Sequence, residues 1–314
     1  MIPHQPPFTM NRFFLLLALL VGLLHDTSAQ NQSLKVISYN IWNGFDWGKD
    51  QEREQAMIQW LKEQDADVIG FQELNAFTPD KLARLAREWG HPYSLLLKED
   101  GYPIGITSKT PLELKGRLLG GFWHGMLHAK TIGIDFLVVH LSPQDWQFRR
   151  SEAEIVSTYI ENVVIKNGQD KYMVIGDYNA HSPFDAGFDL AHPETLRRNR
   201  EGDRQRFEEK GAEAFQTLRN GSFDYSVMSR FLSLPLIDVV QIHTEENRKS
   251  SFPTPLITQD LSPEERAGYR QRIDYILVSP FFEFRCTDAR VINTGTPDRL
   301  SDHYPVIATF AWDD

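Results

Sequence analysis

Short apolar runs rich in valine and isoleucine recur along this chain, and helical patterns separate the early ones. Each run has the length of a single strand, and the flanking polar residues set its limits. Strands that alternate with helices indicate an α/β fold. The later runs come with fewer helices, so we expect mixed sheets rather than purely parallel ones. The clearest runs are residues 34–41, 67–74, 134–141, 171–178, 272–279 and 304–312.

The segments 51–64, 78–90 and 151–168 have the spacing of amphipathic helices, with apolar residues at intervals of three and four. Thr78 is a predicted N-cap and is followed by proline, which is favoured in the first turn. Gly168 is expected to end the third helix. The residues predicted to face the core are Met57, Trp60, Leu61, Leu82, Leu85, Ala86, Trp89, Ala153, Val156, Ile160 and Val163.

Residues 1–29 have the pattern of a cleavable export signal. Arg12 precedes an unbroken apolar run, residues 13–24, and small residues lead to a cleavage site after Ala29. The run is shorter than the roughly 20 residues that a membrane-spanning helix needs. We therefore predict a signal peptide, with either Met1 or Met10 as the start, and a secreted or periplasmic mature protein.

The remaining residues, 30–314, contain no linker, repeat or low-complexity tract, so we predict a single domain. Cys286 is the only cysteine, so no intrachain disulfide can form and the core must be held by burial alone. The formal net charge of −10 means that a polyanionic substrate needs a metal or a local basic patch. The one dense basic stretch, 197–206, is either such a patch or a solvated helical face.

Polar residues of the kinds used in catalysis gather where the predicted strands end. In packed α/β proteins these ends are where ligands and catalytic groups collect. One such residue could be a cap or a turn, but the repetition over several strands indicates a site. Asn40, Glu73, His140, Asp177 and Asn179 close or follow strands, Asp302 and His303 precede one, and Asp274 lies within one.

Most of these side chains offer hard oxygen donors, and the sequence has no CxxC or HExxH motif beside them. Such ligands favour Mg²⁺, with Mn²⁺ or Ca²⁺ as alternatives, over zinc. Mg²⁺ is commonly held by one or two carboxylates and completes its shell with water and substrate phosphate. Phosphate chemistry therefore fits better than acyl or glycosyl transfer, and no GxSxG or SxxK motif argues otherwise.

A histidine that acts as a base needs a carboxylate on its second ring nitrogen. His303 has Asp302 beside it, but neighbours on a strand point to opposite faces. Asp274, from another strand, is therefore the predicted partner of His303.

Six segments carry a resemblance to a known family: "SYNIWNG", "GFQE", "VVHLSP", "GDYNAHSP", "RIDYILVS" and "SDHYPV". In this order and spacing the chain resembles the endonuclease/exonuclease/phosphatase superfamily over residues 35–311. That group includes pancreatic-type deoxyribonucleases, abasic-site endonucleases, neutral sphingomyelinases and inositol-polyphosphate 5-phosphatases. The resemblance implies an α/β fold, a four-layer sandwich of two mixed β-sheets flanked by helices.

The resemblance also implies roles for the residues at the strand ends. Glu73 would be the main metal ligand, with Asn40 beside it and Asp302 near the metal. Asp177 would position the attacking water or its base, and Asn179 would hydrogen-bond the scissile phosphate.

The resemblance and the sequence context assign a different role to each histidine. His303, oriented by Asp274, would contact the phosphate or act as base. His140 matches the histidine that deoxyribonuclease-like and sphingomyelinase-like members use near the leaving group, where abasic-site endonucleases carry a tyrosine. His124 would either line the substrate cleft or sit at a strand edge. His181 is expected to be a hydrogen-bonded loop residue.

The chain is thus expected to be a metal-dependent phosphoric ester hydrolase. A nuclease or related phosphodiesterase comes first, with nucleic acid as substrate and with Arg197 and Arg198 as phosphate contacts. A sphingomyelinase-like lipid phosphodiesterase comes second and would need exposed apolar segments, for which 45–47 and 120–125 are candidates.

A phosphomonoesterase is ranked third. The phosphoinositide branch of the family usually carries more lysines and arginines beside its motifs than this chain does, which speaks against this activity. A catalytically inactive binding domain would have lost Glu73, His140, Asp177 or His303, yet all four are present. No obligate protein partner is indicated.

Overall fold

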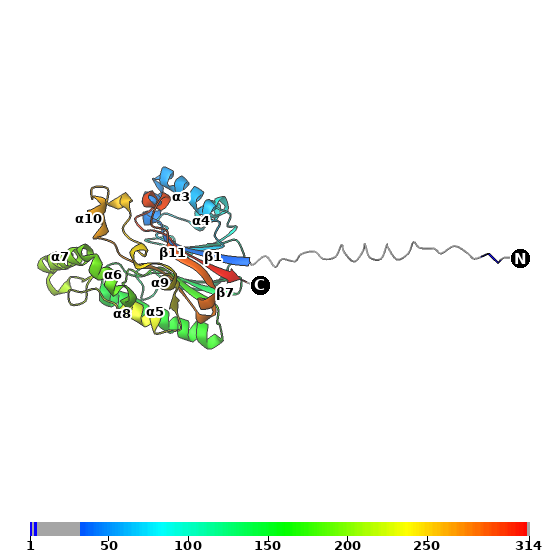
Figure 1. The fold of residues 1–314 in the computed structure, drawn as a ribbon. Helices are drawn as coiled ribbons and strands as arrows, with labels where there is room; N and C mark the ends of the chain where they lie inside the picture. The colour runs from blue at the N-terminus through cyan, green and yellow to red at the C-terminus, as the bar shows by residue number, and fades with distance from the viewer. Residues whose placement is uncertain (2, 5–31, 313–314) are drawn as a thin grey trace.

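The computed structural model describes residues 1, 3–4 and 32–312, so nearly all of the predicted signal segment, 1–29, lies outside the described residues. Two six-stranded sheets pack face to face, and helices cover their outer faces (Figure 1). This is the four-layer α/β sandwich expected from the sequence, which is confirmed. Among the described residues, no helix has the length and apolarity to cross a bilayer.

The first sheet is built from both ends of the chain. Its strands β1 and β2 pair in parallel, and its other described pairs are antiparallel. Across the sheet the order is β11 (Cys286–Val291), β12 (Val306–Trp312), β1 (Gln32–Asn40), β2 (Val68–Gln72), β4 (Gly105–Ser108) and β3 (Tyr93–Leu96).

The second sheet comes from the middle of the chain and is also mixed, with β7 and β8 in parallel. Its other described pairs are antiparallel. The order is β5 (Glu113–Leu118), β6 (Met126–Thr131), β7 (Ile134–His140), β8 (Tyr172–Asp177), β10 (Asp274–Val278) and β9 (Ile237–Asp238).

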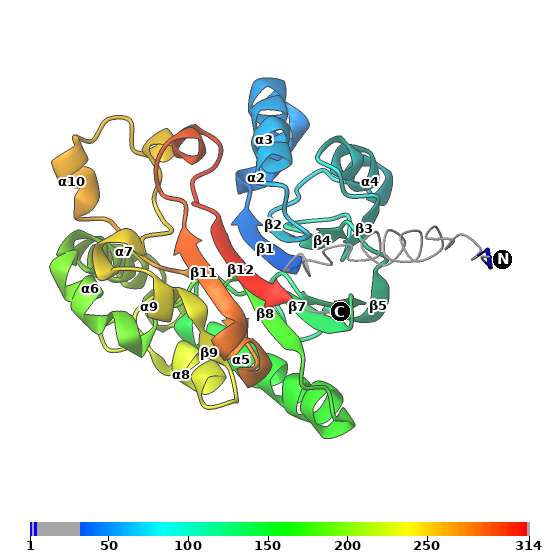
Figure 2. The same cartoon turned by 45° about the vertical axis from the view of Figure 1, so that its right-hand side comes forward.

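The strands β7, β8 and β10 are buried along their whole length. One face of each packs against the other sheet, and helices cover the opposite face (Figure 2). A strand buried on both faces has no reason to alternate apolar with polar residues. This explains why the strands were visible in the sequence as unbroken apolar runs.

The predicted helices 51–64 and 78–90 are observed as α3 (Gln51–Gln64) and α4 (Pro79–Glu88), and both cover the first sheet. Thr78 caps α4 by accepting a hydrogen bond from the backbone N–H of Lys81. α5 (Trp146–Tyr159) and α8 (Ser226–Leu232) cover the second sheet.

The prediction that Val163 faces the core is wrong. α5 begins at Trp146, earlier than the sequence pattern indicated, and continues into a π-helical turn, Ile160–Val164. A π turn holds an extra residue, so the inward face advances by one position. Val164 is therefore buried, and the side chain of Val163 is 38% exposed.

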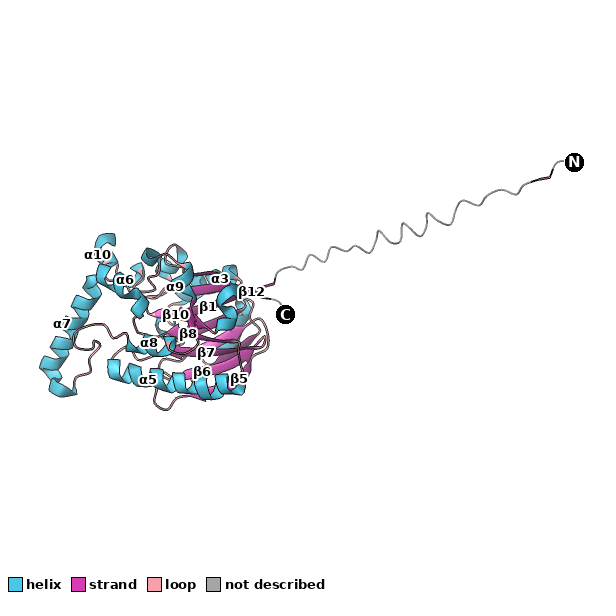
Figure 3. Ribbon diagram, turned by 60° about the horizontal axis from the view of Figure 1, so that its bottom comes forward, coloured by secondary structure: helices cyan, strands magenta, loops and turns pink. Residues whose placement is uncertain are grey.

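The remaining helices belong mainly to the connections around the strand ends. α6, α7 and α10 lie together beyond one end of the sandwich (Figure 3). The helices are α2 (Trp42–Gly48), α6 (Ala186–Ala191), α7 (Pro193–Lys210), α9 (Val239–His243) and α10 (Pro263–Ala267). Short 3₁₀ helices are Ile165–Asn167, Pro183–Asp185, Gly211–Glu213, Glu246–Arg248, Pro255–Ile257, Pro280–Arg285 and Thr296–Arg299.

Candidate active site

The residues predicted from the strand ends meet at the end of the sandwich near α6 and α7. Asn40, His140 and Asp177 are the last residues of β1, β7 and β8. Asp274 begins β10 instead of lying within it. Since β10 runs antiparallel to β8, this start lies directly opposite Asp177.

One carboxylate oxygen, Oδ2 of Asp177, is the centre of the arrangement. It accepts a hydrogen bond of 3.0 Å from Nδ2 of Asn40. The Nε2 atoms of His140 and His303 lie 3.5 and 3.7 Å from the same oxygen. The side chain of Asp177 is almost completely buried. Three segments that are distant in sequence therefore converge on one atom of a fourth.

Glu73 is joined to this centre through Asn40. Nδ2 of Asn40 also lies 3.2 Å from Oε1 of Glu73, and Oε2 of Glu73 accepts from the backbone N–H of Asn43 at 2.7 Å. Glu73 follows β2 directly and has a φ of +61°, which is rare for a residue other than glycine. Such strain at a functional residue persists only where surrounding contacts hold it.

The helix α2, Trp42–Gly48, supplies part of that support and is itself unusual. Every residue in it has a positive φ, so the segment turns in the left-handed sense that side chains normally disfavour. Arg53 holds its start by donating to the carbonyl oxygens of Ile41 and Trp42 at 2.9 and 3.0 Å. The turn directs the Asn43 N–H toward Glu73.

His303 is paired with Asp274, as the sequence predicted: Nδ1 of the ring lies 2.9 Å from Oδ2 of Asp274. The premise of that prediction was inaccurate, because Asp302 and His303 lie in the loop before β12 and not on a strand. Burial lowers the pKa of His303, but the carboxylates of Asp274, Asp177 and Asp302 outweigh it and raise the pKa well above its usual value.

His140 is in the opposite electrostatic situation. Its ring stacks on His124, with centroids 4.0 Å apart and planes 16° from parallel. Burial lowers the pKa of His124 to about 3, and burial together with His124 and His303 lowers the pKa of His140 well below its usual value. Both rings are neutral at physiological pH. His124 lines the cleft and is buried, which excludes the alternative of an exposed strand edge.

Two carboxyl groups of the site, Asp177 and Asp302, have raised pKa values. Burial and the charge of Asp274 raise the pKa of Asp177 to about 8. Burial raises the pKa of Asp302 to about 6, with a contribution from Glu73. Like charges held together in a buried site are relieved by a bound cation. The oxygen-rich donor set therefore fits a hard divalent metal.

Two sets of residues can be considered for such a metal. Asp177, Asp274 and His303 have ligand atoms within 4.8 Å of one another. In that set, however, Asp274 and His303 already bond to each other. Glu73 and Asp302 both line the open cleft and retain unused lone pairs. The ligands expected from the sequence were these two residues together with Asn40, whose amide oxygen accepts a hydrogen bond from the backbone N–H of Trp42.

Asn179 is held just beyond Asp177 with a φ of +47°. Its backbone N–H donates to Oδ1 of Asp177 at 2.9 Å, and its Nδ2 donates to the carbonyl oxygen of Leu141 at 3.0 Å. One amide hydrogen is left to face the cleft. His181 is a hydrogen-bonded loop residue, as expected, with Nδ1 2.8 Å from Oδ1 of Asp189.

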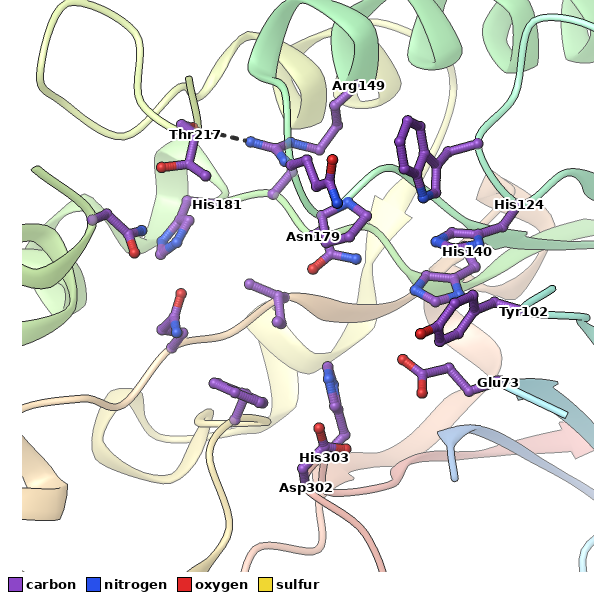
Figure 4. A pocket seen from close by; sticks show the side chains of 18 of the residues that line it. Glu73, Tyr102, His124, His140, Arg149, Asn179, His181, Thr217, Asp302 and His303 are labelled. Carbon is purple, nitrogen blue, oxygen red and sulfur yellow. Dashed lines mark hydrogen bonds between the residues drawn. The ribbon is translucent and has the colours of Figure 1, made fainter. Parts of the chain in front are cut away.

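These residues open into a cleft of about 510 Å³. In Figure 4, Glu73, Tyr102, His124 and His140 form one wall, and Arg149, Thr217 and His181 face it from the other side. Asp302 and His303 lie below them. Other residues that line the cleft are Trp42, Asn43, Trp123, Pro143, Gln144, Asn179, Ala180, Asn199, Phe223, Asp224, Phe252, Gln271 and Ile273.

Sequence reasoning missed Arg149, a buried cation in the wall of the cleft. Its guanidinium donates to the carbonyl oxygens of Ser142 and Thr217 at 2.8 and 3.3 Å, whereas Nε has no partner among the described residues. Burial lowers the pKa of Arg149. In the sequence it is one of two adjacent arginines in an amphipathic helix. Only its position on the buried face of that helix distinguishes it from its neighbour.

Sequence reasoning also missed Glu152, a buried residue of α5. Its Oε1 accepts from the backbone N–H of Trp123 at 2.8 Å, and its Oε2 accepts from that of Ser142 at 2.7 Å. One buried carboxylate thus ties the loop of His124 to the segment that follows His140. Burial raises the pKa of Glu152 to about 7.

Arg197 and Arg198 lie on α7, outside the cleft, where they line a neighbouring hollow of about 340 Å³. This hollow shares Asn199 and Thr217 with the cleft. Arg197 pairs with Glu194 on the same helix. Further along α7, Arg204 and Arg206 also pair with acidic residues of the helix. The basic stretch is therefore mostly a solvated helical face.

Comparison with known proteins agrees with the family and the fold expected from the sequence. The sequence profile of the Endonuclease/Exonuclease/phosphatase family matches residues 37–303. No curated protein matches the chain significantly in sequence. An AP endonuclease from Archaeoglobus fulgidus has a similar structure, with a TM-score of 0.64 at 20% identity over 89% of this chain and 100% of that one.

Two structures from Neisseria are also similar. The 3′ phosphatase NExo bound to a product DNA hairpin has a TM-score of 0.61 at 18% identity. The 3′–5′ exonuclease NExo from Neisseria meningitidis has a TM-score of 0.59 at 19% identity. Each comparison covers 89% of this chain and 100% of the other. At these identities the likeness establishes the fold.

Proposed function

The chain belongs to the endonuclease/exonuclease/phosphatase family, and from that premise we propose that it is a Mg²⁺-dependent phosphodiesterase that cleaves nucleic acid. Membership makes it a phosphoric ester hydrolase. The observation that carries the finer proposal is the convergence of Asn40, His140 and His303 on one oxygen of Asp177, inside a cleft bordered by Glu73.

We assign the metal to Glu73 and Asp302. A divalent cation bound there would polarise the phosphoryl oxygens and offset the negative charge that develops on them. Asn40 has its amide oxygen occupied by the N–H of Trp42 and its amide nitrogen between Glu73 and Asp177. In this position it fixes the two carboxylates relative to each other.

The side chains around Asp177 supply the proton transfers. A cation bound at the neighbouring carboxylates would lower the raised pKa of Asp177, and ionised Asp177 would then accept a hydrogen bond from the attacking water and orient it toward phosphorus. Cationic His303, held by Asp274, donates to a non-bridging phosphate oxygen. Neutral His140, whose Nε2 lies 3.5 Å from the same oxygen of Asp177, would donate a hydrogen bond toward the departing oxygen, and the proton that Asp177 removes from the attacking water would reach that oxygen through solvent. The free amide hydrogen of Asn179 provides a further contact to the phosphate.

The charge of the cleft favours a diester over a monoester. Among the described residues, Arg149 is the only lysine or arginine that lines it. A phosphodiester carries one negative charge, whereas a monoester approaches two near neutral pH. The single negative charge of a diester is a better match for the positive groups of the cleft, which are one arginine, one cationic histidine and one metal.

Nucleic acid is proposed as the substrate because proteins of similar structure include an AP endonuclease and a 3′ phosphatase bound to a DNA hairpin. The acidic chain would then recognise its substrate mainly inside the cleft rather than by long-range attraction. A lipid phosphodiester is the second candidate, since Trp47 and Trp123 are about half exposed near the cleft.

A substrate panel tests this proposal. Protein comprising residues 30–314 would be incubated with single-stranded DNA, RNA, sphingomyelin, phosphoinositides and sugar phosphates, with Mg²⁺ or with EDTA. We expect Mg²⁺-dependent cleavage of DNA or RNA and little release from the other substrates. Turnover of lipid or monoesters without cleavage of nucleic acid would contradict the proposal.

A further inference from the structure

Three large aromatic side chains form an exposed border on one side of the cleft, and we call them the aromatic rim: Trp47, Tyr102 and Trp123. Their exposed fractions are 46%, 36% and 47%. Tyr102 and Trp123 also line the cleft itself. The rim is therefore a continuation of the catalytic cleft onto the surface.

The rings of the rim are connected to the catalytic histidine. Trp47 and Tyr102 make an edge-to-face contact at 6.4 Å, and Tyr102 meets His124 in the same manner at 5.3 Å. Trp123 contacts His124 at 6.5 Å. His124 in turn stacks on His140. These contacts fix the ring orientations, so the rim presents preformed surfaces.

We propose that the aromatic rim stacks the unpaired bases of a single-stranded nucleic acid next to the phosphate that is cleaved. This inference rests on the proposed function, and it specifies the substrate as a strand whose bases are not paired. Base stacking on aromatic side chains tolerates any sequence, because every base has a π face, and one stacked base typically changes affinity by about ten-fold or more.

The charges beside the rim favour bases over phosphates or lipid. Asp46 and Lys49 flank Trp47, and their side chains are 59% and 75% exposed. A membrane-inserted Trp47 would bring the Asp46 carboxylate to the lipid boundary, which is costly. A stacked base does not bring the Asp46 carboxylate into an apolar layer. The phosphates of the strand can also point away from this carboxylate.

Lys98 provides a place for a neighbouring phosphate. Its Nζ atom lies beside Gly101, the residue that precedes Tyr102 of the aromatic rim. Lys98 makes no ion pair among the described residues. A strand with its bases on the rim thus meets an unpaired cation near the catalytic histidine.

The experiment compares two single-stranded octamers with Mg²⁺: one of thymidines, and one in which abasic sugars replace alternate thymidines. The proteins are the wild type, Trp47→Ala, Trp123→Ala and the conservative Trp123→Phe. Phe284→Ala is the matched control, because this phenylalanine is 93% exposed and follows β10 at the far end of the sandwich. Surface substitutions of this kind leave the fold intact.

We expect each alanine variant to raise KM for the thymidine octamer by about ten-fold with kcat little changed. The wild type should have a lower KM for the thymidine octamer than for the abasic one. In each alanine variant this difference in KM should be smaller by the same factor. Trp123→Phe should retain most of the affinity, and Phe284→Ala should behave as the wild type. A direct readout in EDTA, quenching of tryptophan fluorescence by the uncleaved octamer, should give the same ranking.

Two results separate the failure of this inference from the failure of the proposed function. If the wild type cleaves neither octamer and no other DNA or RNA, the proposed function is wrong, whereas cleavage of duplex DNA without cleavage of either octamer would overturn only this inference. If it cleaves both equally well and the rim variants leave KM unchanged, the function stands and the aromatic rim has no role in stacking. Co-sedimentation of the wild type with phosphatidylcholine vesicles, lost in Trp47→Ala and Trp123→Ala, would also overturn the inference by assigning the rim to membranes.

Discussion

His140 ends β7 of the second sheet and His303 lies in the loop before β12 of the first sheet, yet their Nε2 atoms lie 3.5 and 3.7 Å from the same oxygen of Asp177. Their environments shift their pKa values in opposite directions, because His140 is buried against His124 and His303 is paired with Asp274. One ring is therefore neutral and the other is cationic at neutral pH. Groups whose pKa values are separated in this way can divide acid and base roles.

The first prediction concerns the metal. Replacing Glu73 by Gln should abolish most Mg²⁺-dependent hydrolysis, because a carboxylate that we assign to the cation loses its charge. The expected loss is several kcal/mol of transition-state stabilisation. Steady-state assays over a range of Mg²⁺ concentrations would measure it, with thermal unfolding as a check of the fold. Activity within a few-fold of the wild type, with the same Mg²⁺ dependence, would show the assignment to be wrong.

The second prediction concerns the two histidines. His140→Ala and His303→Ala should each lower kcat by at least about a hundred-fold, the lower scale for a general acid or base. Melting temperatures should stay near the wild type. The double variant should lose less than the product of the single effects, because both groups act on one transition state. If melting temperatures fall steeply while turnover per folded molecule is preserved, both roles are structural.

The third prediction concerns the pH profile. Asp274 is one cause of the raised pKa of His303, so Asp274→Asn should bring that pKa down. If cationic His303 is the active form, the alkaline limb of the profile of kcat/KM should move to lower pH. Measuring kcat/KM between pH 5 and 10 for both proteins tests this. An alkaline limb that stays in place would mean that another group controls it.

The fourth prediction concerns stability and Glu152. Burial raises the pKa of Glu152 from its usual 4.5 to about 7, so the folded state favours the protonated form. The stability associated with it is complete below pH 4.5 and is lost as the pH rises to 7, by about 3 kcal/mol in this window. Glu152→Gln cannot ionise and should lose less stability over the same range.

Urea unfolding of the wild type and of Glu152→Gln at pH 5 and pH 8 in EDTA would measure this difference. Asp177 and Asp302 also titrate in this range, but they are common to both proteins, so their effect cancels in the comparison. Equal pH dependence in the two proteins would show that Glu152 is ionised throughout.

The fifth prediction concerns the compartment. The apolar run over 13–24 and the small residues before the cleavage site motivate export with processing after Ala29. N-terminal sequencing of protein recovered from the medium or periplasm should begin at Gln30. A membrane-bound product that keeps Met1 or Met10 would contradict it.

Several features of the chain were predictable from local sequence because their causes are local. The helix α4 begins at Pro79 because Thr78 caps it, and the buried strands appear as apolar runs because both of their faces are covered. The polar residues at the strand ends could also be recognised in the sequence, because each of them stands where an apolar run stops. These patterns also carried the resemblance that the family match confirms.

Other features depended on contacts between distant segments. Val163 and Val164 are adjacent, and only the π turn, formed against the second sheet, decides which one is buried. The left-handed turn at Trp42–Gly48 contradicts the local preference of its residues and is held at its start by Arg53. The two carboxylate contacts of Glu152 likewise exist only in the folded chain.

The sequence by itself determined the groups of the site that lie at strand ends, because the apolar pattern around them sets their places, but not Arg149 or Glu152, which lie on α5. It did not determine their protonation. The tertiary structure decided that His140 is neutral and His303 is cationic, because burial and the distance to Asp274 set each pKa. Electrostatic energy depends on separation and on exclusion of water, and both quantities arise only when the two sheets close around the site.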